Sequence, residues 1–219
     1  MVLRSTSYAF RDRADAGRRL GARLTDLGLH DGPLVLGLPR GGVTVAAEVA
    51  AALDGQLDVL VARKLAHPHQ PELALGALAE GGSPVWDNTM LRSMGLDSDD
   101  LADVVSAERQ ELARRVATYR RDRPAPDVHG RVVVLVDDGV ATGATARAAL
   151  RALGDRGAAR LLLAVPVAAP ESLPTFTDAD QVVALLAPAN FGAVGRWYDD
   201  FTQLSDEDVR RALARLPAR

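Results

Sequence analysis

The sequence predicts an α/β fold in three layers, with a parallel sheet between two layers of helices. Short apolar runs alternate with amphipathic or alanine-rich segments, which is the pattern of strand–helix–strand units. The 219 residues are 47% hydrophobic but only 4% aromatic, so small aliphatic side chains must fill the interior, as helices packed on a parallel sheet permit. A chain of this length fits a single domain over residues 1–219 better than two independent domains.

Five short apolar runs predict the strands of this sheet. They cover Pro33–Leu38, Leu57–Ala62, Arg131–Val136, Leu161–Val167 and Val182–Leu186. Each run is apolar throughout most of its length rather than alternating between apolar and polar residues. Strands of this composition are buried on both faces, which fits a parallel sheet covered by helices.

The helices are predicted from amphipathic spacing and from their caps. Ser98 is a predicted N-cap with two aspartates in the first turn, and Ser205 begins a capping box. The predicted helices are Phe10–Leu27, Val43–Leu53, Ser98–Arg121, Ala144–Leu153, a short one near Glu171–Phe176 and a last one from Ser205. Residues 63–90 instead predict a flexible loop that runs into a β-ribbon.

Composition excludes several classes of function. The formal net charge is −3, so no overall basic field draws the chain to nucleic acid or to anionic lipid. Cysteine is absent, which excludes disulfides, thiolate zinc sites and a cysteine nucleophile. The first residues contain no apolar stretch resembling a signal-peptide core, and the run Leu161–Pro170 is too short to span a bilayer. We therefore expect a cytoplasmic protein with no nucleic-acid or membrane partner.

Two carboxylates and a small-residue turn follow the strand Arg131–Val136. Ligands bind parallel sheets where strands end and helices begin, and there the chain reads Asp137-Asp138, then Thr142-Gly143-Ala144-Thr145. Gly143 lets backbone N–H groups approach a phosphate, and the threonine hydroxyls add donors. Vicinal carboxylates suit a sugar cis-diol, because each can accept hydrogen bonds from hydroxyls. Together they indicate a ribose 5-phosphate site; the alternative is a turn whose acids only cap the next helix.

The string from Val133 to Thr145, VVLVDDGVATGAT, resembles the signature with which type I phosphoribosyltransferases bind phosphoribosyl pyrophosphate (PRPP). The resemblance implies a Rossmann-like sheet of that kind, with a small hood and β-ribbon added, and a homodimer. It implies that Asp137 and Asp138 hold the ribose hydroxyls and, mainly through bound PRPP and water, Mg²⁺. The residues implied to hold the 5-phosphate are Ala141, Thr142, Gly143, Ala144 and Thr145.

One position departs from part of that family. In members that act on 6-oxopurines, a third acid stands just before the Thr-Gly pair and meets the purine N7, and here that position is Ala141. The loop resembles those of adenine-type and uracil-type members more closely. We therefore expect a base other than hypoxanthine or guanine.

A second anion site is predicted after the first strand. Gly41 and Gly42 expose N–H groups at a helix start, and Arg40 adds a fixed bidentate charge. The alternative is an ordinary strand-to-helix turn with a surface arginine. The family's pyrophosphate loop, often with a cis peptide, occupies this place in the order of elements. Arg63-Lys64 is expected to end the second strand at the same edge, with Lys64 against the pyrophosphate or simply extending into solvent.

The segment after Lys64 matches in position the mobile loop that closes over PRPP in the family. Its stretch Pro71–Ala77, PELALGA, also resembles a recurring feature of a bacterial subgroup of phosphoribosyltransferases of unsettled substrate, and this likeness runs from Phe10 to the C-terminal helix. His67 and His69 could donate protons, bind a metal, or lie in solvent, and the sequence leaves their role open.

The base is expected near residues 188–219, a C-terminal hood. A nucleobase needs flat apolar faces and a few polar groups along its edge. Phe191, Trp197 or Tyr198 could stack on it, and Asp199 or Asp200 could bind ring N–H groups. The alternative is an aromatic clamp that fixes the C-terminal helix to the sheet.

These expectations together predict an enzyme of nucleotide salvage. It would transfer ribose 5-phosphate from PRPP to a nucleobase-like acceptor, with Mg²⁺, and release pyrophosphate; Arg40, Lys64, Asp137 and Asp138 would be its catalytic residues. One alternative is a PRPP-sensing regulator without turnover, although the chain has no helix-turn-helix extension. Another is a ribonucleotide hydrolase or phosphorylase that uses the same pocket. The sequence leaves the base open.

Overall fold

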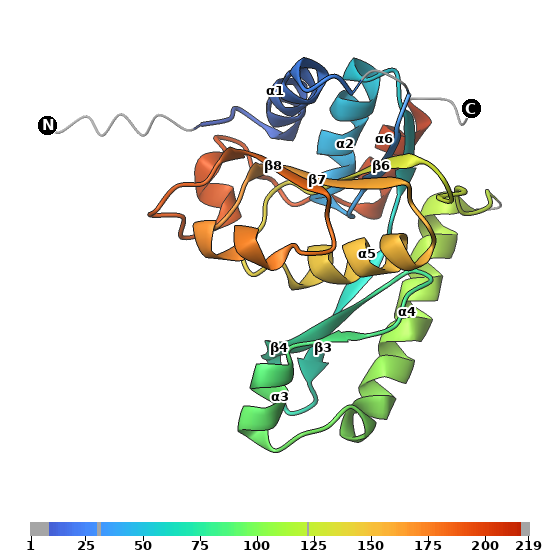
Figure 1. Cartoon of the computed structure of the whole chain (residues 1–219), viewed down its shortest axis with the longest axis vertical. Helices are drawn as coiled ribbons and strands as arrows, with labels where there is room; N and C mark the ends of the chain where they lie inside the picture. The colour runs from blue at the N-terminus through green and yellow to red at the C-terminus, as the bar shows by residue number, and fades with distance from the viewer. Residues whose placement is uncertain (1–8, 30–31, 122, 216–219) are drawn as a thin grey trace, which may run out of the picture.

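A five-stranded parallel sheet forms the centre of the molecule, as predicted (Figure 1). The computed structural model describes residues 9–29, 32–121 and 123–215. The sheet has the order β2-β1-β6-β7-β8, from β1 (Leu34–Gly37), β2 (Gln56–Val59), β6 (Val132–Val136), β7 (Arg160–Val167) and β8 (Gln181–Leu186). The order reverses between β1 and β6, which are neighbours, so the carboxyl ends of these two strands mark the switch point where α/β sheets bind ligands.

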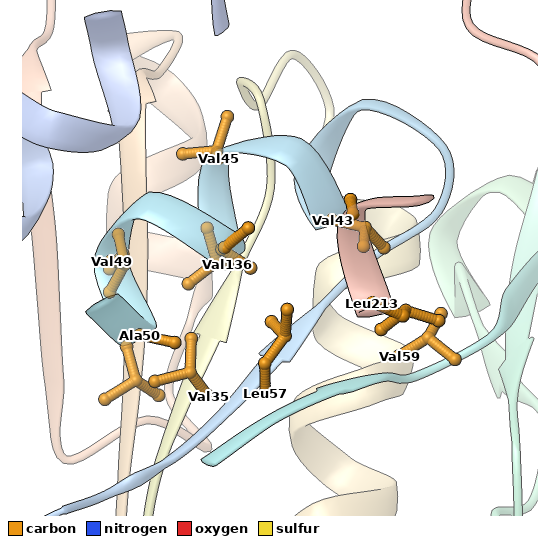
Figure 2. Close-up of a cluster of buried hydrophobic side chains, with 14 of the residues drawn as sticks. Val35, Val43, Val45, Val49, Ala50, Leu57, Val59, Val136 and Leu213 are labelled. Atoms are coloured by element: carbon orange, nitrogen blue, oxygen red, sulfur yellow. The ribbon is translucent and has the colours of Figure 1, made fainter. Parts of the chain in front are cut away.

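Helices cover both faces of this sheet, which confirms the three layers. One face carries α1 (Arg13–Asp26), α2 (Gly41–Ala52) and α6 (Asp206–Ala214), and the other carries α5 (Ala144–Asp155). Successive residues of a strand point to opposite faces. Val35 and Val136 accordingly pack beneath Val49 and its neighbours on α2 (Figure 2), whereas Leu36 belongs to the cluster under α5.

A smaller antiparallel sheet lies beside the central one and forms the predicted ribbon. It has the order β3-β4-β5, from β3 (Ala62–His67), β4 (Gln70–Ala79) and β5 (Val85–Trp86). Two helices, α3 (Asn88–Met94) and α4 (Ala102–Arg120), complete this part, and it has its own small core of Leu75, Leu91 and Leu101. The flexibility expected near residues 63–90 and the single-domain organisation stay predictions.

Three local predictions in this region are wrong. The predicted strand Leu57–Ala62 ends at Val59, and Ala62 already pairs with Ala79 in the ribbon, because the chain changes its hydrogen-bonding partner there. The predicted helix from Ser98 begins as a 3₁₀ turn, η1 (Asp99–Leu101), and the Ser98 side chain does not cap it. The carboxylate of Asp97 accepts the N–H bonds of Asp99 and Asp100 instead. Helix α3 was not predicted.

The chain after β7 agrees with the sequence pattern. The short helix is a 3₁₀ segment, η2 (Pro170–Thr175), and a further one, η3 (Val194–Trp197), lies in the aromatic segment. The capping box of α6 is confirmed, with Ser205 and Asp208 bonded reciprocally. Among the described residues, no helix has the length and apolar character needed to cross a bilayer.

Candidate active site

The two predicted anion loops meet at the switch point between β1 and β6. A side-chain carbon added to Gly42 would lie 2.7 Å from the carbonyl oxygen of Val136 and 2.8 Å from Cα of Asp137. One added to Gly41 would lie 1.8 Å from Oδ2 of Asp138. Neither position has room for a side chain, because the loop after β1 packs directly on the tip of β6. The peptide bond between Pro39 and Arg40 is cis, at the place where the family resemblance led us to expect one.

The loop after β6 encloses a cavity of about 210 Å³. Gly143 has a φ of +74°, which favours glycine, and it precedes the first residue of α5. The backbone of Val140 is bonded to β7 on both sides, with N–H to the Val167 carbonyl at 2.9 Å. The cavity is lined by Lys64, Asp137, the loop from Gly139 to Ala146 and Val194. The structure thus brings Ala141, Thr142, Gly143, Ala144 and Thr145 together around one small cavity at a helix N-terminus.

Asp137 faces this cavity and is only partly exposed. Burial raises the pKa of its carboxyl well above the usual range, and the neighbouring Asp138 charge raises the pKa further. One opposing contribution is local, because Oδ1 of Asp137 accepts a hydrogen bond from the Asp138 backbone N–H at 2.8 Å. The charge of Asp137 is therefore poorly compensated without a ligand.

Asp138 is bound by a residue that the sequence did not indicate. The Nε of Arg13, at the start of α1, donates to Oδ2 of Asp138 over 2.7 Å, and the two residues are 125 positions apart. The Arg13 side chain is 10% exposed and that of Asp138 16%. The backbone carbonyl of Asp138 accepts a hydrogen bond from the Tyr198 hydroxyl at 2.5 Å. The sequence around Arg13 or Asp138 gives no indication that two residues so far apart in the chain are in contact.

Lys64 lines the cavity of the loop after β6, and it belongs to β3 of the ribbon rather than to the end of the second strand of the central sheet. The contact with pyrophosphate expected for it stays a prediction. Alternate residues of a strand point to opposite sides, and Arg63 accordingly pairs with Glu108 of α4 at 2.7 Å. Arg40 is partly exposed and directly precedes α2. No hydrogen bond or ion pair is recorded for its guanidinium within the residues the structure describes, so the group is available to an anion.

A second cavity, of about 330 Å³, adjoins the first between the ribbon and α5. The two cavities share Lys64, Thr142 and Ala144. The remaining wall is mostly apolar and includes Trp86. Lys64 therefore lies between the phosphate loop and a second space that the sequence did not predict.

The C-terminal aromatic segment is mainly a packing element. Phe191 is 6% exposed and Tyr198 2% exposed, and both belong to a cluster with Phe10. Trp197 is partly buried, and its indole N–H donates to the Phe191 carbonyl at 3.1 Å. Of the two alternatives for this segment, burial favours the clamp for Phe191 and Tyr198. Trp197 and the exposed Asp199 stay candidates for contact with a base.

His67 and His69 lie at the turn between β3 and β4. The ring nitrogen of His67 accepts a hydrogen bond from the His69 backbone N–H at 3.1 Å, and the ring centroids are 5.9 Å apart. This local bond gives His67 a structural role in the turn. The described residues contain no group of three or more His, Asp or Glu side chains that could hold a metal ion.

Comparison with known proteins identifies the family. The model of the phosphoribosyl transferase domain matches residues 13–183. The chain belongs to the phosphoribosyltransferase family. Two curated relatives from Mycobacterium tuberculosis, strains CDC 1551 and H37Rv, carry the name "putative phosphoribosyl transferase", and each is 47% identical over 207 residues. That match covers 94% of this chain and 46% of the relative, so the chain spans about half the length of the curated relatives it matches.

Two further matches bear on fold and substrate. The crystal structure of TT1426 from Thermus thermophilus is 48% identical, with a TM-score of 0.81, over 94% of this chain and 98% of that chain. A uracil phosphoribosyltransferase from Lactobacillus gasseri is 42% identical over 62 residues, which is 28% of this chain and 30% of the relative. Family membership confirms the predicted resemblance and makes this a domain of the transferase class.

The residues at the switch point fit Mg²⁺ bound mainly through a ligand. Mg²⁺ keeps several waters and commonly binds one or two carboxylates together with substrate phosphates. Asp137 offers such a carboxylate at the cavity, whereas Oδ2 of Asp138 is already bound to Arg13. The donor set suits a cation that arrives with a phosphorylated ligand rather than one held by the protein alone.

Proposed function

We propose that this domain transfers the 5-phosphoribosyl group of PRPP to a nitrogenous base and releases pyrophosphate. The observation that carries the proposal is the meeting of two anion loops at the switch point, with Asp137 in contact with both. A side-chain carbon on Gly42 would lie only 3.0 Å from Oδ1 of Asp137, and the Asp137 side chain lines the phosphate cavity. Two anion sites joined by carboxylates match a ribose that carries a phosphate at one end and a pyrophosphate at the other.

Each part of the site has a task in this reaction. The backbone N–H groups of the loop from Ala141 to Thr145 bind the 5-phosphate at the N-terminus of α5. Asp137 and Asp138 accept hydrogen bonds from the ribose hydroxyls. Arg40 and Lys64, with the N–H groups of Gly41 and Gly42, bind the pyrophosphate. Fixed in this way, the ribose C1 is held for attack by a base nitrogen.

Bond breaking at C1 places positive charge on the ribose. The pyrophosphate leaves with the bonding electron pair, the base nitrogen forms the new bond, and the proton of that nitrogen passes to water or to a basic group. The Asp137 carboxylate stabilises the positive ribose, and Arg40 and Lys64 stabilise the leaving pyrophosphate. Mg²⁺, which Asp137 and the bound phosphates would hold, would supply additional neutralisation of the negative charge on the leaving group.

We propose a base other than hypoxanthine or guanine. A purine that attacks through N9 gains when an acid meets its N7, and acid–base help of this kind contributes about 10²–10⁴ in rate. Ala141 offers only an exposed methyl group at the place where the family's 6-oxopurine members carry that acid. The segment shared with a uracil phosphoribosyltransferase supports a base of the uracil type, and the resemblance of the loop to adenine-type members supports adenine as well.

The test incubates the protein with PRPP, Mg²⁺ and each base of a panel, and it measures the pyrophosphate that is released. Adenine, uracil, orotate, hypoxanthine, guanine and xanthine are compared side by side. Turnover of adenine or uracil is expected, and efficient turnover of hypoxanthine or guanine would contradict the inference from Ala141. Binding of PRPP without turnover of any base would favour the sensing regulator.

Binding itself is tested by thermal unfolding. A ligand at about a hundredfold excess over its Kd adds about 2.7 kcal/mol to the free energy of unfolding. PRPP with Mg²⁺ should raise the melting temperature, and Asp137→Asn should abolish that rise without lowering the stability of the ligand-free protein. The matched control is Asp103→Asn, an exposed residue of α4, which should leave the shift unchanged. An unaltered shift in Asp137→Asn would remove Asp137 from the site.

We also propose a homodimer in a reducing cytoplasm. The absence of cysteine supports the compartment, and the family resemblance supports the dimer. Light scattering of the purified chain measures the mass in solution, and a monomer at micromolar concentration would contradict the dimer.

A further inference from the structure

We infer that Arg13 is a positioning residue of the phosphoribosyl site, which holds one oxygen of Asp138 so that the other faces the ribose hydroxyls. The inference rests on the proposed function and adds to it a residue outside both anion loops. Arg13 belongs to α1 and acts on the ligand through Asp138 rather than by contact. Four observations support this role.

The guanidinium of Arg13 makes three contacts with two segments of the chain, the tip of β6 and residues 201–202. Its Nε donates to Oδ2 of Asp138 at 2.7 Å, and its Nη1 donates to the backbone carbonyl of Thr202 at 3.0 Å. Its Cζ lies 3.8 Å from the centre of the Phe201 ring, which is the geometry of a cation–π contact. A guanidinium held at three points has a defined orientation, so its bond to Asp138 has a defined direction.

Three polar groups of Asp138 are bound to other residues. Its N–H donates to Asp137, its carbonyl accepts from Tyr198, and its Oδ2 accepts from Arg13. Its carboxylate also contacts that of Asp137, and this contact contributes to the raised pKa of Asp137. Among the described residues, no N–H group donates to Oδ1 of Asp138, and that atom is not one of the buried atoms that lack a partner. Oδ1 is therefore the acceptor that this residue can offer to a hydroxyl group.

Gly41 shows how tightly the Arg13–Asp138 pair fits against the pyrophosphate loop. A side-chain carbon on Gly41 would lie 1.8 Å from Oδ2 of Asp138 and 2.7 Å from Nε of Arg13. Gly41 has no positive φ, so the requirement for glycine comes from the ion pair and not from the backbone conformation. The pair therefore occupies the space directly beneath the loop proposed to bind pyrophosphate.

The charges around Asp138 explain why a cation is needed there. The adjacent Asp137 is itself a carboxylate in partly buried surroundings, and two carboxylates so close repel each other. The guanidinium of Arg13, which is not part of the wall of the phosphate cavity, opposes this repulsion. Without it, the Asp138 side chain would turn toward solvent and lose its fixed direction toward the sugar.

The test compares sugars that differ by one hydroxyl. Dissociation constants of ribose 5-phosphate, 2-deoxyribose 5-phosphate and inorganic phosphate are measured by calorimetry for the wild type, Arg13→Met and Arg13→Lys. Arg13→Met should weaken ribose 5-phosphate about tenfold or more, the size of a lost hydrogen bond to a charged group, and leave phosphate unchanged. The preference for ribose over 2-deoxyribose should therefore shrink, and Arg13→Lys should restore part of it.

Two further variants separate positioning from a merely structural role. Gly41→Ala keeps the arginine but would crowd both Oδ2 of Asp138 and Nε of Arg13, so it should reproduce the loss of preference for ribose. Arg19→Met is the matched control, since Arg19 is also on α1, pairs with an aspartate at 2.9 Å and lies over the ring of Phe10, but does not touch Asp138. Its preference for ribose should equal that of the wild type.

The outcomes distinguish failure of the positioning role of Arg13 from failure of the proposed function. Equal weakening of all three ligands in Arg13→Met, or an unchanged preference for ribose in a folded variant, would overturn the positioning role. If Arg13→Met does not fold, the preference for ribose over 2-deoxyribose in Arg13→Lys and Gly41→Ala decides instead. Failure of the wild type to bind ribose 5-phosphate or PRPP would instead overturn the proposed function, and the inference with it.

Discussion

The ligand edge of the sheet and the junction between the ribbon and the sheet each contain a buried arginine with different surroundings. Arg120 at the junction is 2% exposed and donates to the carboxylates of Asp58 and Glu80 and to the Val59 carbonyl. Arg13 at the ligand edge binds one carboxylate and one carbonyl, and no N–H group among the described residues donates to Oδ1 of Asp138. The first network is buried and leaves Oε2 of Glu80 without a hydrogen-bond partner, whereas the second lies at the edge where parallel sheets bind ligands.

The same contrast holds for two buried tyrosines. Tyr119 at the junction donates to the Asp206 carboxylate at 2.8 Å and joins α4 to α6. Tyr198 at the ligand edge donates to the backbone carbonyl of Asp138. Burial and the nearby Asp138 charge both raise the pKa of Tyr198, so its hydroxyl keeps its proton over the physiological range. Identical residue types therefore stabilise one region and orient ligand-binding atoms in the other.

The largest expected effect is at the junction. Arg120→Met should lower the free energy of unfolding by about 3–5 kcal/mol, because it leaves two carboxylates buried without their cation. Urea denaturation measures this loss, and the preference for ribose 5-phosphate over its 2-deoxy analogue should not change. Arg115→Met is the control, since Arg115 pairs with Glu111 on the surface of the same helix and should cost less than about 1 kcal/mol. A change in sugar preference with Arg120→Met would break the distinction between the two regions.

The next effect concerns the pyrophosphate loop. Arg40→Ala should weaken PRPP and pyrophosphate about ten- to hundredfold, as expected for loss of a charge-assisted hydrogen bond, and should change ribose 5-phosphate much less. Calorimetry with the three ligands measures the difference. Arg18→Ala is the control, because Arg18 lies on α1 and pairs with Glu48 at 3.9 Å. Equal losses for all ligands would mean that Arg40 serves the fold alone.

At the ligand edge, Tyr198→Phe removes the donor to the Asp138 carbonyl while keeping the ring. The free energy of unfolding should fall by about 1–2 kcal/mol, since a partly buried carbonyl loses its partner. The affinity for ribose 5-phosphate should fall with it, because the position of Asp138 is less well defined. A loss of stability with unchanged affinity would place Tyr198 with the structural residues of the junction.

The smallest expected effect is at Tyr119 and depends on pH. Burial, followed by the hydrogen bond to Asp206, raises the pKa of Tyr119 to about 12. Between the ordinary tyrosine pKa near 10 and this value, the folded state holds a proton that the unfolded state has lost, so stability falls as pH rises. Tyr119→Phe should cost about 1 kcal/mol at pH 8 and remove this part of the alkaline loss. A difference between the two proteins that stays constant up to pH 11.5 would contradict the pKa assignment.

Local signals predicted the unit around β6 and α5 well. An apolar run, two acids, a small-residue turn and an alanine-rich helix are adjacent in sequence, so each boundary can be read from its neighbours. The strand is found at Val132–Val136 and the helix begins at Ala144, as predicted. The strand that carries Lys64 was assigned to the wrong sheet, and the contact of Lys64 with pyrophosphate stays a prediction.

The parts that could not be predicted depend on distant contacts. Arg13 looks like any arginine in the first turn of an amphipathic helix, and only the folded chain brings it to Asp138. After Val59 the chain leaves the central sheet and pairs within the ribbon. The apolar run does not indicate this change, because strands of both sheets contain the same kinds of residue. Phe191 and Tyr198 illustrate a third limit, since an aromatic cluster has the same composition whether it stacks on a ligand or packs against α1.

The pairing of β1 with β6 also has a consequence for folding kinetics. Leu34 lies opposite Val133, and the whole ribbon with α3 and α4 is inserted between these two partners. Parallel pairings across so long an insertion close late, because the intervening chain must be ordered first. Both anion loops depend on this closure, so the binding site is absent from early folding species. A ligand of the site should therefore slow unfolding rather than accelerate folding, and it would protect a finished molecule without assisting a nascent one.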